Sequence, residues 1–340
     1  MRTEIIGRAR PLALVGVLAI LIVACGGPGA TSRPPTQPAA TQPAATQPMA
    51  SEPIASEPAG GVDLTGASFT VGSKEFTEQL ILGQITIQVL EAAGATVTDQ
   101  TGLVGSTVVR EALVSGDIDM YWEYTGTGWI NHLANETPVV GTEEQYVAVR
   151  DADAANDIVW LEPAPLNNTY AIAVASETAT ALSLTSLSDL SAYVPTSAGA
   201  TLCAASEFLG REDGLPGLQT AYDFEFSEVA TLELGLIPSQ IDTGDTCVFG
   251  EVFATDARIA DLDLVVLEDD LDFFAVYEPS LNVRQEVFDA NPGLAELFAP
   301  VAASLDTVTM QGLNAQVDVD GQEPADVAAA FLSEMGLVGE

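Results

Sequence analysis

Two patterns of apolar positions alternate along the chain beyond residue 66. Short apolar runs at Ser68–Val71, Ala95–Thr98 and Ile118–Trp122 are typical of buried strands. Between the first two, Phe76–Ala93 carries apolar residues at helical spacing and stops at Gly94. This alternation predicts an α/β sheet that binds ligands at the carboxyl ends of its strands.

Capping residues predict a second helix in this region. Ser106 is expected to cap a helix that runs through Val114 and ends at Gly116. Thr127 is expected to open another helix after the strand at 118–122. The loop Gly72–Glu75 is expected to connect the first strand with its helix.

The same alternation resumes near residue 170. The expected strands are Tyr170–Ala175, Thr201–Ala204, Thr246–Phe249 and Leu264–Leu267. The expected helices are Ser186–Leu190, Leu215–Tyr222, Pro238–Ile241, and the C-terminal stretches Asn291–Ala303, Thr307–Val317 and Pro324–Met335, which should pack back on the first lobe. We therefore predict two α/β lobes, 64–168 plus 278–340 and 169–277, with the ligand cleft between them.

The N-terminus has the pattern of a secretion signal. Three arginines precede the uncharged apolar run Pro11–Ala24, which is short for a membrane span but suits a signal peptide. The run ends at Cys25 in a sequence that resembles a bacterial lipobox, so residues 1–25 are expected to be a signal and Cys25 the lipidated N-terminus. The alternative is an uncleaved anchor helix. Both place the rest of the chain outside the cytoplasm.

Residues 26–63 are expected to be a disordered tether. Proline recurs about every five residues among Thr, Gln, Ala, Ser and Glu, so this segment lacks the apolar residues for a core. It would hold a soluble module away from the membrane. About 280 residues remain for the folded part.

Charge removes some functions from consideration. The chain has 10 Lys plus Arg against 49 Asp plus Glu, a formal net charge of −39. Such a surface repels nucleic acid and anionic lipid headgroups. Lys74 is the single lysine, and five arginines follow the tether: Arg110, Arg150, Arg211, Arg258 and Arg284. A lone lysine on a chain otherwise depleted in it is a candidate for a site, although a leftover surface residue is the simpler reading.

The remaining cysteines fit an oxidising compartment. With Cys25 used for lipid, Cys203 and Cys247 form an even pair, and we expect a disulfide between them. Two small buried thiols are the alternative.

Five local sequences, in order, resemble the osmoprotectant-binding family of ABC importers, the glycine betaine/carnitine/choline-binding proteins. They are Val71–Gln79, Tyr121–Thr127, Arg211–Pro216, Ala254–Arg258 and Leu267–Asp270. The resemblance covers residues 66 to 340. It implies the type II periplasmic-binding-protein fold, with an ABC permease and ATPase as partners. The lipobox implies attachment to the membrane through the lipid anchor, and we expect a monomer without a cofactor.

The family resemblance also implies a ligand site. By motif, aromatic rings that surround a quaternary ammonium fall on Tyr124, Tyr170, Tyr277 and Phe253, and donors to a ligand carboxylate fall on Lys74, Thr127 and Arg211. Family members often carry tyrosine in place of Phe253 and acidic residues in place of Asn167 and Asn168. Each tyrosine has core packing as its alternative role, and Arg211 has an ion pair with Glu207 or Asp213.

Aromatic rings suit such a ligand for a physical reason. A fully methylated nitrogen has no N–H to donate, whereas the negative faces of aromatic rings attract it, each by up to ~2 kcal/mol. A betaine also carries a carboxylate for Lys74, Arg211 and Thr127. Choline does not, so we expect carboxylate-bearing betaines to be preferred.

An enzyme is not expected. The single histidine, His132, follows Trp129 on a predicted helix, where a packed or surface imidazole is the expected role. We find no His/Cys metal cluster and no glycine-rich phosphate loop in the sequence. The competing functions are a binding protein for another solute, such as an amino acid or a polyamine, and a sensor or receptor partner. A polyamine site would require carboxylates among its rings.

Overall fold

The computed structural model describes residues 61–135 and 137–338. The predicted signal peptide, Cys25 and residues 26–60 of the predicted tether lie outside the described residues. Val62, near the predicted end of the tether, is already half-buried against the first apolar core.

The first sheet has five strands in the order β2-β1-β3-β10-β4. Their bounds are β1 Ser68–Lys74, β2 Thr96–Leu103, β3 Met120–Tyr124, β4 Ile158–Trp160 and β10 Pro279–Arg284. β1 runs parallel to both β2 and β3, whereas β10 is antiparallel to β3 and β4. A strand from the C-terminal part of the chain is therefore paired between two N-terminal strands.

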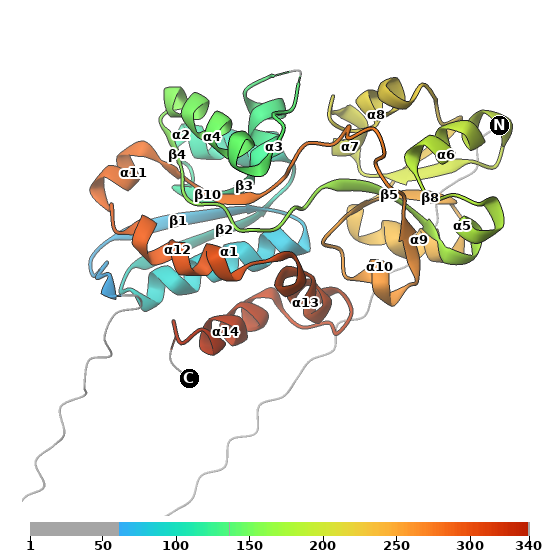
Figure 1. Ribbon diagram of the computed structural model, residues 1–340. Helices are drawn as coiled ribbons and strands as arrows, with labels where there is room; N and C mark the ends of the chain where they lie inside the picture. The colour runs from blue at the N-terminus through green and yellow to red at the C-terminus, as the bar shows by residue number, and fades with distance from the viewer. Residues whose placement is uncertain (1–60, 136, 339–340) are drawn as a thin grey trace, which may run out of the picture. The chain divides into compact units, whose positions relative to one another are not determined.

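Helices cover both faces of this sheet (Figure 1). They are α1 Thr77–Ala92, α2 Ser106–Ser115, α3 Thr125–Thr127, the π-helix η2 Gly128–His132, α4 Thr142–Asp153, η3 Ala154–Asn156, α11 Gln285–Ala290, α12 Leu294–Ser304, α13 Thr307–Asp318 and α14 Pro324–Glu334. The apolar faces of α1, α12, α13 and α14 join β1 and β10 in one buried core. The expectation that the C-terminal helices pack on the first lobe is therefore confirmed.

The second sheet has the order β7-β6-β8-β5-β9. Its strands are β5 Tyr170–Ala175, β6 Thr201–Ala204, β7 Glu228–Thr231, β8 Phe249–Phe253 and β9 Leu264–Val266. β6 is parallel to β7 and β8, while β5 is antiparallel to β8 and β9. The helices of this lobe are α5 Ser176–Leu182, α6 Leu187–Tyr193, η4 Val194–Thr196, α7 Ser206–Gly210, α8 Leu215–Tyr222, η5 Leu234–Leu236, α9 Ile237–Thr243 and α10 Arg258–Asp261.

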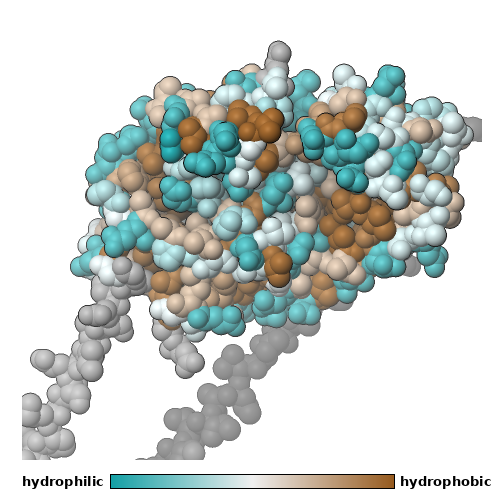
Figure 2. All heavy atoms as spheres, in the orientation of Figure 1, coloured by the Kyte–Doolittle hydropathy of each residue, from teal (hydrophilic) through white to brown (hydrophobic). Residues whose placement is uncertain are grey.

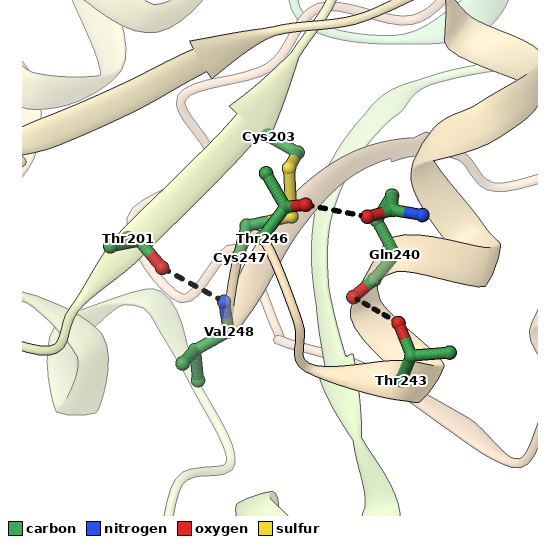
Figure 3. Close-up of a disulfide and its surroundings, with 7 residues drawn as sticks. All are labelled: Thr201, Cys203, Gln240, Thr243, Thr246, Cys247 and Val248. Carbon is green, nitrogen blue, oxygen red and sulfur yellow. Dashed lines mark hydrogen bonds between the residues drawn. A yellow bond between two sulfur atoms is a disulfide. The ribbon is translucent and has the colours of Figure 1, made fainter.

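A disulfide joins Cys203 of β6 to Cys247, just before β8 (Figure 3). Both residues are fully buried, with their Cα atoms 5.6 Å apart. Beside the bridge, the Val248 N–H donates to the Thr201 hydroxyl at 3.1 Å. The bridge thus ties together two strands that continue toward the site.

The two-lobed α/β fold predicted from the sequence is confirmed, with corrections to single elements. β1 extends to Lys74, because Gly72 and Lys74 pair with β2 where a loop was expected. The strand expected at 246–249 is wrong: β8 begins at Phe249 and pairs with β5 as far as Phe253. Ser106 does not cap α2, because its hydroxyl donates to Glu207 instead.

The surface carries few large apolar patches on the face shown in Figure 2, where apolar and polar side chains intermingle. No helix in the described parts of the chain has both the length and the apolar character that a membrane crossing requires.

Candidate functional site

A cavity of about 570 Å³ lies where both sheets present the ends of their strands. All seven residues that the sequence analysis proposed for ligand binding line it: Lys74, Tyr124, Thr127, Tyr170, Arg211, Phe253 and Tyr277. Lys74 and Tyr124 end β1 and β3, Tyr170 begins β5, and Phe253 ends β8. Residues from distant parts of the sequence therefore converge because strand ends from both sheets meet here.

Aromatic rings form a continuous wall along this cavity. The Phe76 ring centroid lies 6.2 Å from that of Tyr124 and 5.0 Å from that of Phe253. The Tyr170 centroid lies 5.2 Å from that of Phe253 and 5.7 Å from that of Tyr277, with the last pair edge to face. Such spacings are those of mutually packed rings. Burial raises the pKa of the Tyr124, Tyr170 and Tyr277 phenols well above the usual range, so these rings stay neutral.

Gly126 permits the position of the Tyr277 ring. A Cβ atom at residue 126 would lie 2.8 Å from two ring carbons of Tyr277 and 2.8 Å from the Val276 carbonyl oxygen. A real Cβ does not approach backbone and ring atoms so closely. Any side chain at this position would therefore displace Tyr277, which lies on the cavity wall.

Lys74 is fixed beside the aromatic wall by a buried carboxylate. Its Nζ lies 2.6 Å from Glu123 Oε1 and 5.0 Å from the Tyr124 ring centroid. Glu123 Oε2 is 2.7 Å from His132 Nε2 and accepts a bond from the Tyr121 hydroxyl at 2.9 Å. Burial opposes the charge of Glu123, but Lys74 and His132 outweigh it and hold its pKa below the usual range. His132 has the packed role expected for it, with a side chain 5% exposed.

Arg211 has two carboxylate partners within its own lobe. Its guanidinium pairs with Asp213 and, at 2.7 Å, with Glu207 Oε1. The alternative that Arg211 pairs with Glu207 or Asp213 therefore describes the structure, and both acids take part. The guanidinium also lies 5.5 Å from the Tyr170 ring centroid and donates to the Thr127 hydroxyl at 3.3 Å.

Glu207 connects the two lobes. Its carboxylate accepts bonds from the Ser106 backbone N–H at 3.0 Å and from the Ser106 hydroxyl at 2.6 Å, at the start of α2. The N-cap residue of α2, Gly105, offers no side chain, so a carboxylate from the opposite lobe satisfies this helix terminus. Burial opposes the charge of Glu207, but Lys74 and Arg211 lower its pKa.

A second buried carboxyl, Glu78, holds the phenol of Tyr124. Glu78 Oε1 accepts from the Tyr124 hydroxyl at 2.8 Å and from the Asn168 amide at 2.8 Å. Burial raises the pKa of the Glu78 carboxyl. Asn168 thus places an amide beside the cavity, and Glu78 of α1 places a carboxyl there.

The cavity wall also contains residues that sequence reasoning did not propose for ligand binding, among them Phe76, Glu78, Asn168 and Glu251. Phe76 and Glu78 lie inside the first of the five motifs, and Glu251 stands two positions before Phe253 on the same strand face. A period-two reading of the strand would have found Glu251, but only with the strand bounds in hand. Over residues 61–135 and 137–338, no group of three or more His, Cys, Asp or Glu residues is arranged to hold a metal ion.

Comparison with known proteins gives a consistent result. Residues 67–334 match a family model described as the substrate binding domain of ABC-type glycine betaine transport system, OpuAC. The chain is 39% identical over 280 residues to a glycine-betaine-binding protein of Pseudomonas aeruginosa, and the alignment covers 79% of this chain and 88% of that protein. It is 36% identical over 281 residues to the glycine betaine-binding protein YehZ of Escherichia coli, which covers 78% of this chain and 90% of that one.

The fold is similar to solved structures as well. A crystal structure titled glycine betaine/carnitine/choline ABC transporter superposes with a TM-score of 0.65 at 27% identity, covering 79% of this chain and 99% of the other. The apo structure of YehZ superposes with a TM-score of 0.60 at 34% identity, covering 80% of this chain and 100% of the other.

Proposed function

The chain belongs to the family of substrate-binding domains of ABC-type glycine betaine transport systems, and from this premise we propose that it captures a quaternary-ammonium osmoprotectant outside the cytoplasm for an ABC importer. Two similar proteins, from Pseudomonas aeruginosa and Escherichia coli, are named for glycine betaine binding. We take a glycine betaine-like compound as the ligand class.

The aromatic wall is the observation that carries this proposal. The cavity is lined by Tyr124, Phe76, Phe253, Tyr170 and Tyr277, and neighbouring rings in that order lie 5.0–6.2 Å apart. Together these rings form an aromatic cage whose negative π faces attract a methylated cation, by up to ~2 kcal/mol for each desolvated ring. Five rings can contribute about 10 kcal/mol at most, and association costs about 4 kcal/mol or more. The rings alone therefore fall short of the net value of about 8 kcal/mol that micromolar affinity requires. Charge-assisted hydrogen bonds to the far end of the ligand, about 1.5–3 kcal/mol each, supply the rest.

We propose that the far end of the ligand meets Arg211, Thr127 and Lys74. All three line the cavity, and Arg211 already contacts Thr127. Lys74 is paired with Glu123, and Arg211 is paired with Glu207 and Asp213, so a ligand carboxylate would share these cations with protein carboxylates. Arg211 uses four of its five N–H groups on Asp213, Glu207 and Thr127, so the expected preference for betaines over choline rests on the one N–H of Nη1 that remains.

A different cationic solute, such as a polyamine, is the second candidate function. Such a ligand requires carboxylates among the rings, and Glu78 and Glu251 both line the cavity beside Tyr124 and Phe253. The two ligand classes differ in their hydrogen-bond donors. A quaternary ammonium has no N–H, whereas a primary amine would need both carboxylates as hydrogen-bond acceptors. A ligand-delivery role for a sensor is the third candidate and predicts the same site.

We further propose that lobe I comprises residues 64–168 and 278–340 and lobe II residues 169–277, with Cys25 lipidated at the mature N-terminus and the protein acting as a monomer. β5 begins at Tyr170 and β10 at Pro279, which supports these boundaries. Metabolic labelling with a fatty acid, comparing the natural chain with Cys25→Ala, tests the anchor.

Calorimetric titration with glycine betaine, proline betaine, carnitine, choline and spermidine tests the ligand class. We expect a micromolar dissociation constant for at least one quaternary-ammonium compound and no measurable binding of spermidine. Tight binding of spermidine alone would replace the proposal by the polyamine function.

A further inference from the structure

Glu251 is a buried carboxyl on β8, the strand that presents Phe253 to the aromatic wall. It is 2% exposed and lines the cavity. Its Oε2 accepts from the Ala205 backbone N–H at 2.7 Å. Among the described residues, none donates a hydrogen bond to its other oxygen, Oε1. That oxygen is not fully covered by protein atoms. One carboxyl oxygen therefore remains available to the cavity.

The sheet register places this carboxyl among the rings. On β8, Glu251 and Phe253 point to the same face, since they are two positions apart. In the antiparallel pair of β8 with β5, Glu251 lies opposite Ile172 and Phe253 opposite Tyr170, so all four side chains share that face. A cation held by Tyr170 and Phe253 would thus lie beside Glu251.

The charged and titratable groups around Glu251 come from few elements. Glu207 of α7 raises the pKa of Glu251, and Arg211, just beyond α7, lowers it. The negative charge of Glu251 in turn raises the pKa of the Tyr170 phenol on β5. From the other elements packed against β8, α9 brings Ile237 and Ile241 against Gly250, and β6 brings Leu202 and the disulfide Cys203. Lys74 acts on Glu207 from the opposite lobe.

Burial raises the pKa of Glu251 to about 8, and the neighbouring Glu207 adds to the shift. The carboxyl is therefore mostly neutral at pH 7 while the cavity holds no cation. A cation nearby favours the charged form of an acid and lowers its pKa. By linkage, a bound cation expels this proton, and the affinity for that cation rises with pH until the carboxyl is ionised without it.

We propose that Glu251 is a specificity-determining residue of the cleft: its carboxyl becomes negative together with a bound cation and so favours a net-cationic ligand over a zwitterion. This inference rests on the proposed function, because it assumes a quaternary-ammonium ligand in the cage. A trimethylammonium alcohol such as choline offers only positive charge to Glu251. In glycine betaine the ligand's own carboxylate opposes the ionisation of Glu251.

The test is calorimetric titration of the natural chain with choline and with glycine betaine between about pH 6 and about pH 9, where neither ligand changes charge. We expect choline affinity to rise by up to about tenfold per pH unit until it levels off above the pKa of about 8. The betaine affinity should rise less, so the ratio of the two affinities should increase with pH.

Two variants assign the effect to one carboxyl. Glu251→Gln keeps the acceptor for the Ala205 N–H but cannot ionise, so its ratio should be independent of pH. Glu278→Gln is the control, because Glu278 is another carboxyl whose pKa burial raises, but it does not line the cavity. It should keep the pH dependence of the natural chain.

Proton release can be measured on the natural chain, so this test does not depend on whether a variant folds. Titration of choline in two buffers of different ionisation enthalpy should show close to one proton released for each choline bound at neutral pH. A constant affinity ratio across the pH range, or the same slope in Glu251→Gln, would overturn the inference and leave the proposed function standing. If neither ligand binds at any pH, both are overturned.

Discussion

The ammonium group of Lys74 lies 2.6 Å from the carboxylate of Glu123, and their side chains are only 4% and 0% exposed. The single lysine of the chain is thus half of a buried ion pair at the carboxyl ends of β1 and β3. Glu123 also accepts a bond from the Tyr124 backbone N–H at 2.7 Å, so the same carboxylate positions both Lys74 and the strand that presents Tyr124. As a result, the Lys74 ammonium group is held beside the Tyr124 ring.

Replacing Glu123 by glutamine should lower the free energy of unfolding by about 3–5 kcal/mol at neutral pH, because Lys74 would remain buried without its counter-charge. The pKa of Glu123 is depressed in the folded state. Its contribution is therefore present above the unfolded pKa near 4.5 and is lost as pH falls below it. Urea unfolding between about pH 3 and about pH 7 measures this.

The natural chain should lose stability toward acid more steeply than Glu123→Gln. Asp151→Asn is the control, since Asp151 forms an ion pair with Arg150 on the surface, where side chains are 63% and 40% exposed. That pair should contribute less than about 1 kcal/mol. Equal pH slopes in the natural chain and Glu123→Gln would contradict the assigned role.

Tyr124 contributes a ring to the cavity and a hydroxyl to Glu78. Tyr124→Ala should weaken osmolyte binding by about 1–2 kcal/mol through loss of the ring face. Tyr124→Phe should retain most of the affinity but lower stability by about 1–3 kcal/mol, since the buried Glu78 would lose a donor. Calorimetry for affinity and thermal unfolding for stability separate the two effects. Equal losses of affinity would argue against the aromatic cage.

Phe76 should contribute to affinity although no motif argument selected it. Its ring lies between Tyr124 and Phe253 and is half-buried on the cavity wall. Phe76→Leu removes the π face and should weaken binding several-fold with little change in stability. Phe208→Leu is the control, because Phe208 is fully buried behind Tyr170 with centroids 5.1 Å apart. Phe208→Leu should lower stability and leave affinity unchanged. If Phe76→Leu lowered stability and left affinity unchanged, Phe76 would not belong to the cage.

Reducing the Cys203–Cys247 bridge should destabilise the second lobe. The bridge closes a loop with a sequence separation of 44 residues, for which a loss of about 2–4 kcal/mol is typical. Thermal unfolding of the Cys203→Ser, Cys247→Ser double variant against the natural chain measures the loss. Thiol titration of the unfolded, unreduced protein should find neither cysteine free, and two free thiols would show that the pair is not bonded.

The contact between Ser106 and Glu207 should slow ligand release, because it joins the two lobes beside the cavity. Ser106→Ala removes the hydroxyl bond and should increase the dissociation rate constant several-fold, with the association rate constant unchanged. Stopped-flow fluorescence with Ser115→Ala as the control tests this, since Ser115 is exposed at the other end of α2. An unchanged release rate would mean that this contact between the lobes does not slow ligand release.

The sequence by itself determined the alternation of strand and helix, the family and the seven proposed ligand contacts. Strands such as Tyr170–Ala175 and helices such as Leu215–Tyr222 were predicted with their observed bounds, because local apolar periodicity dictates them. Lys74 and Tyr124 were proposed from the family resemblance, and the structure places each at a strand end, where side chains are free to meet a ligand.

Only the tertiary structure decided what charge those residues present. Glu123 neutralises Lys74 from another strand, Glu207 reaches Ser106 from the opposite lobe, and Glu251 enters the cavity through a strand whose start lies three residues later than its sequence suggested. The reason is physical: ion pairing and burial depend on distances across the fold. Residues far apart in the chain acquire those distances only when the two sheets meet.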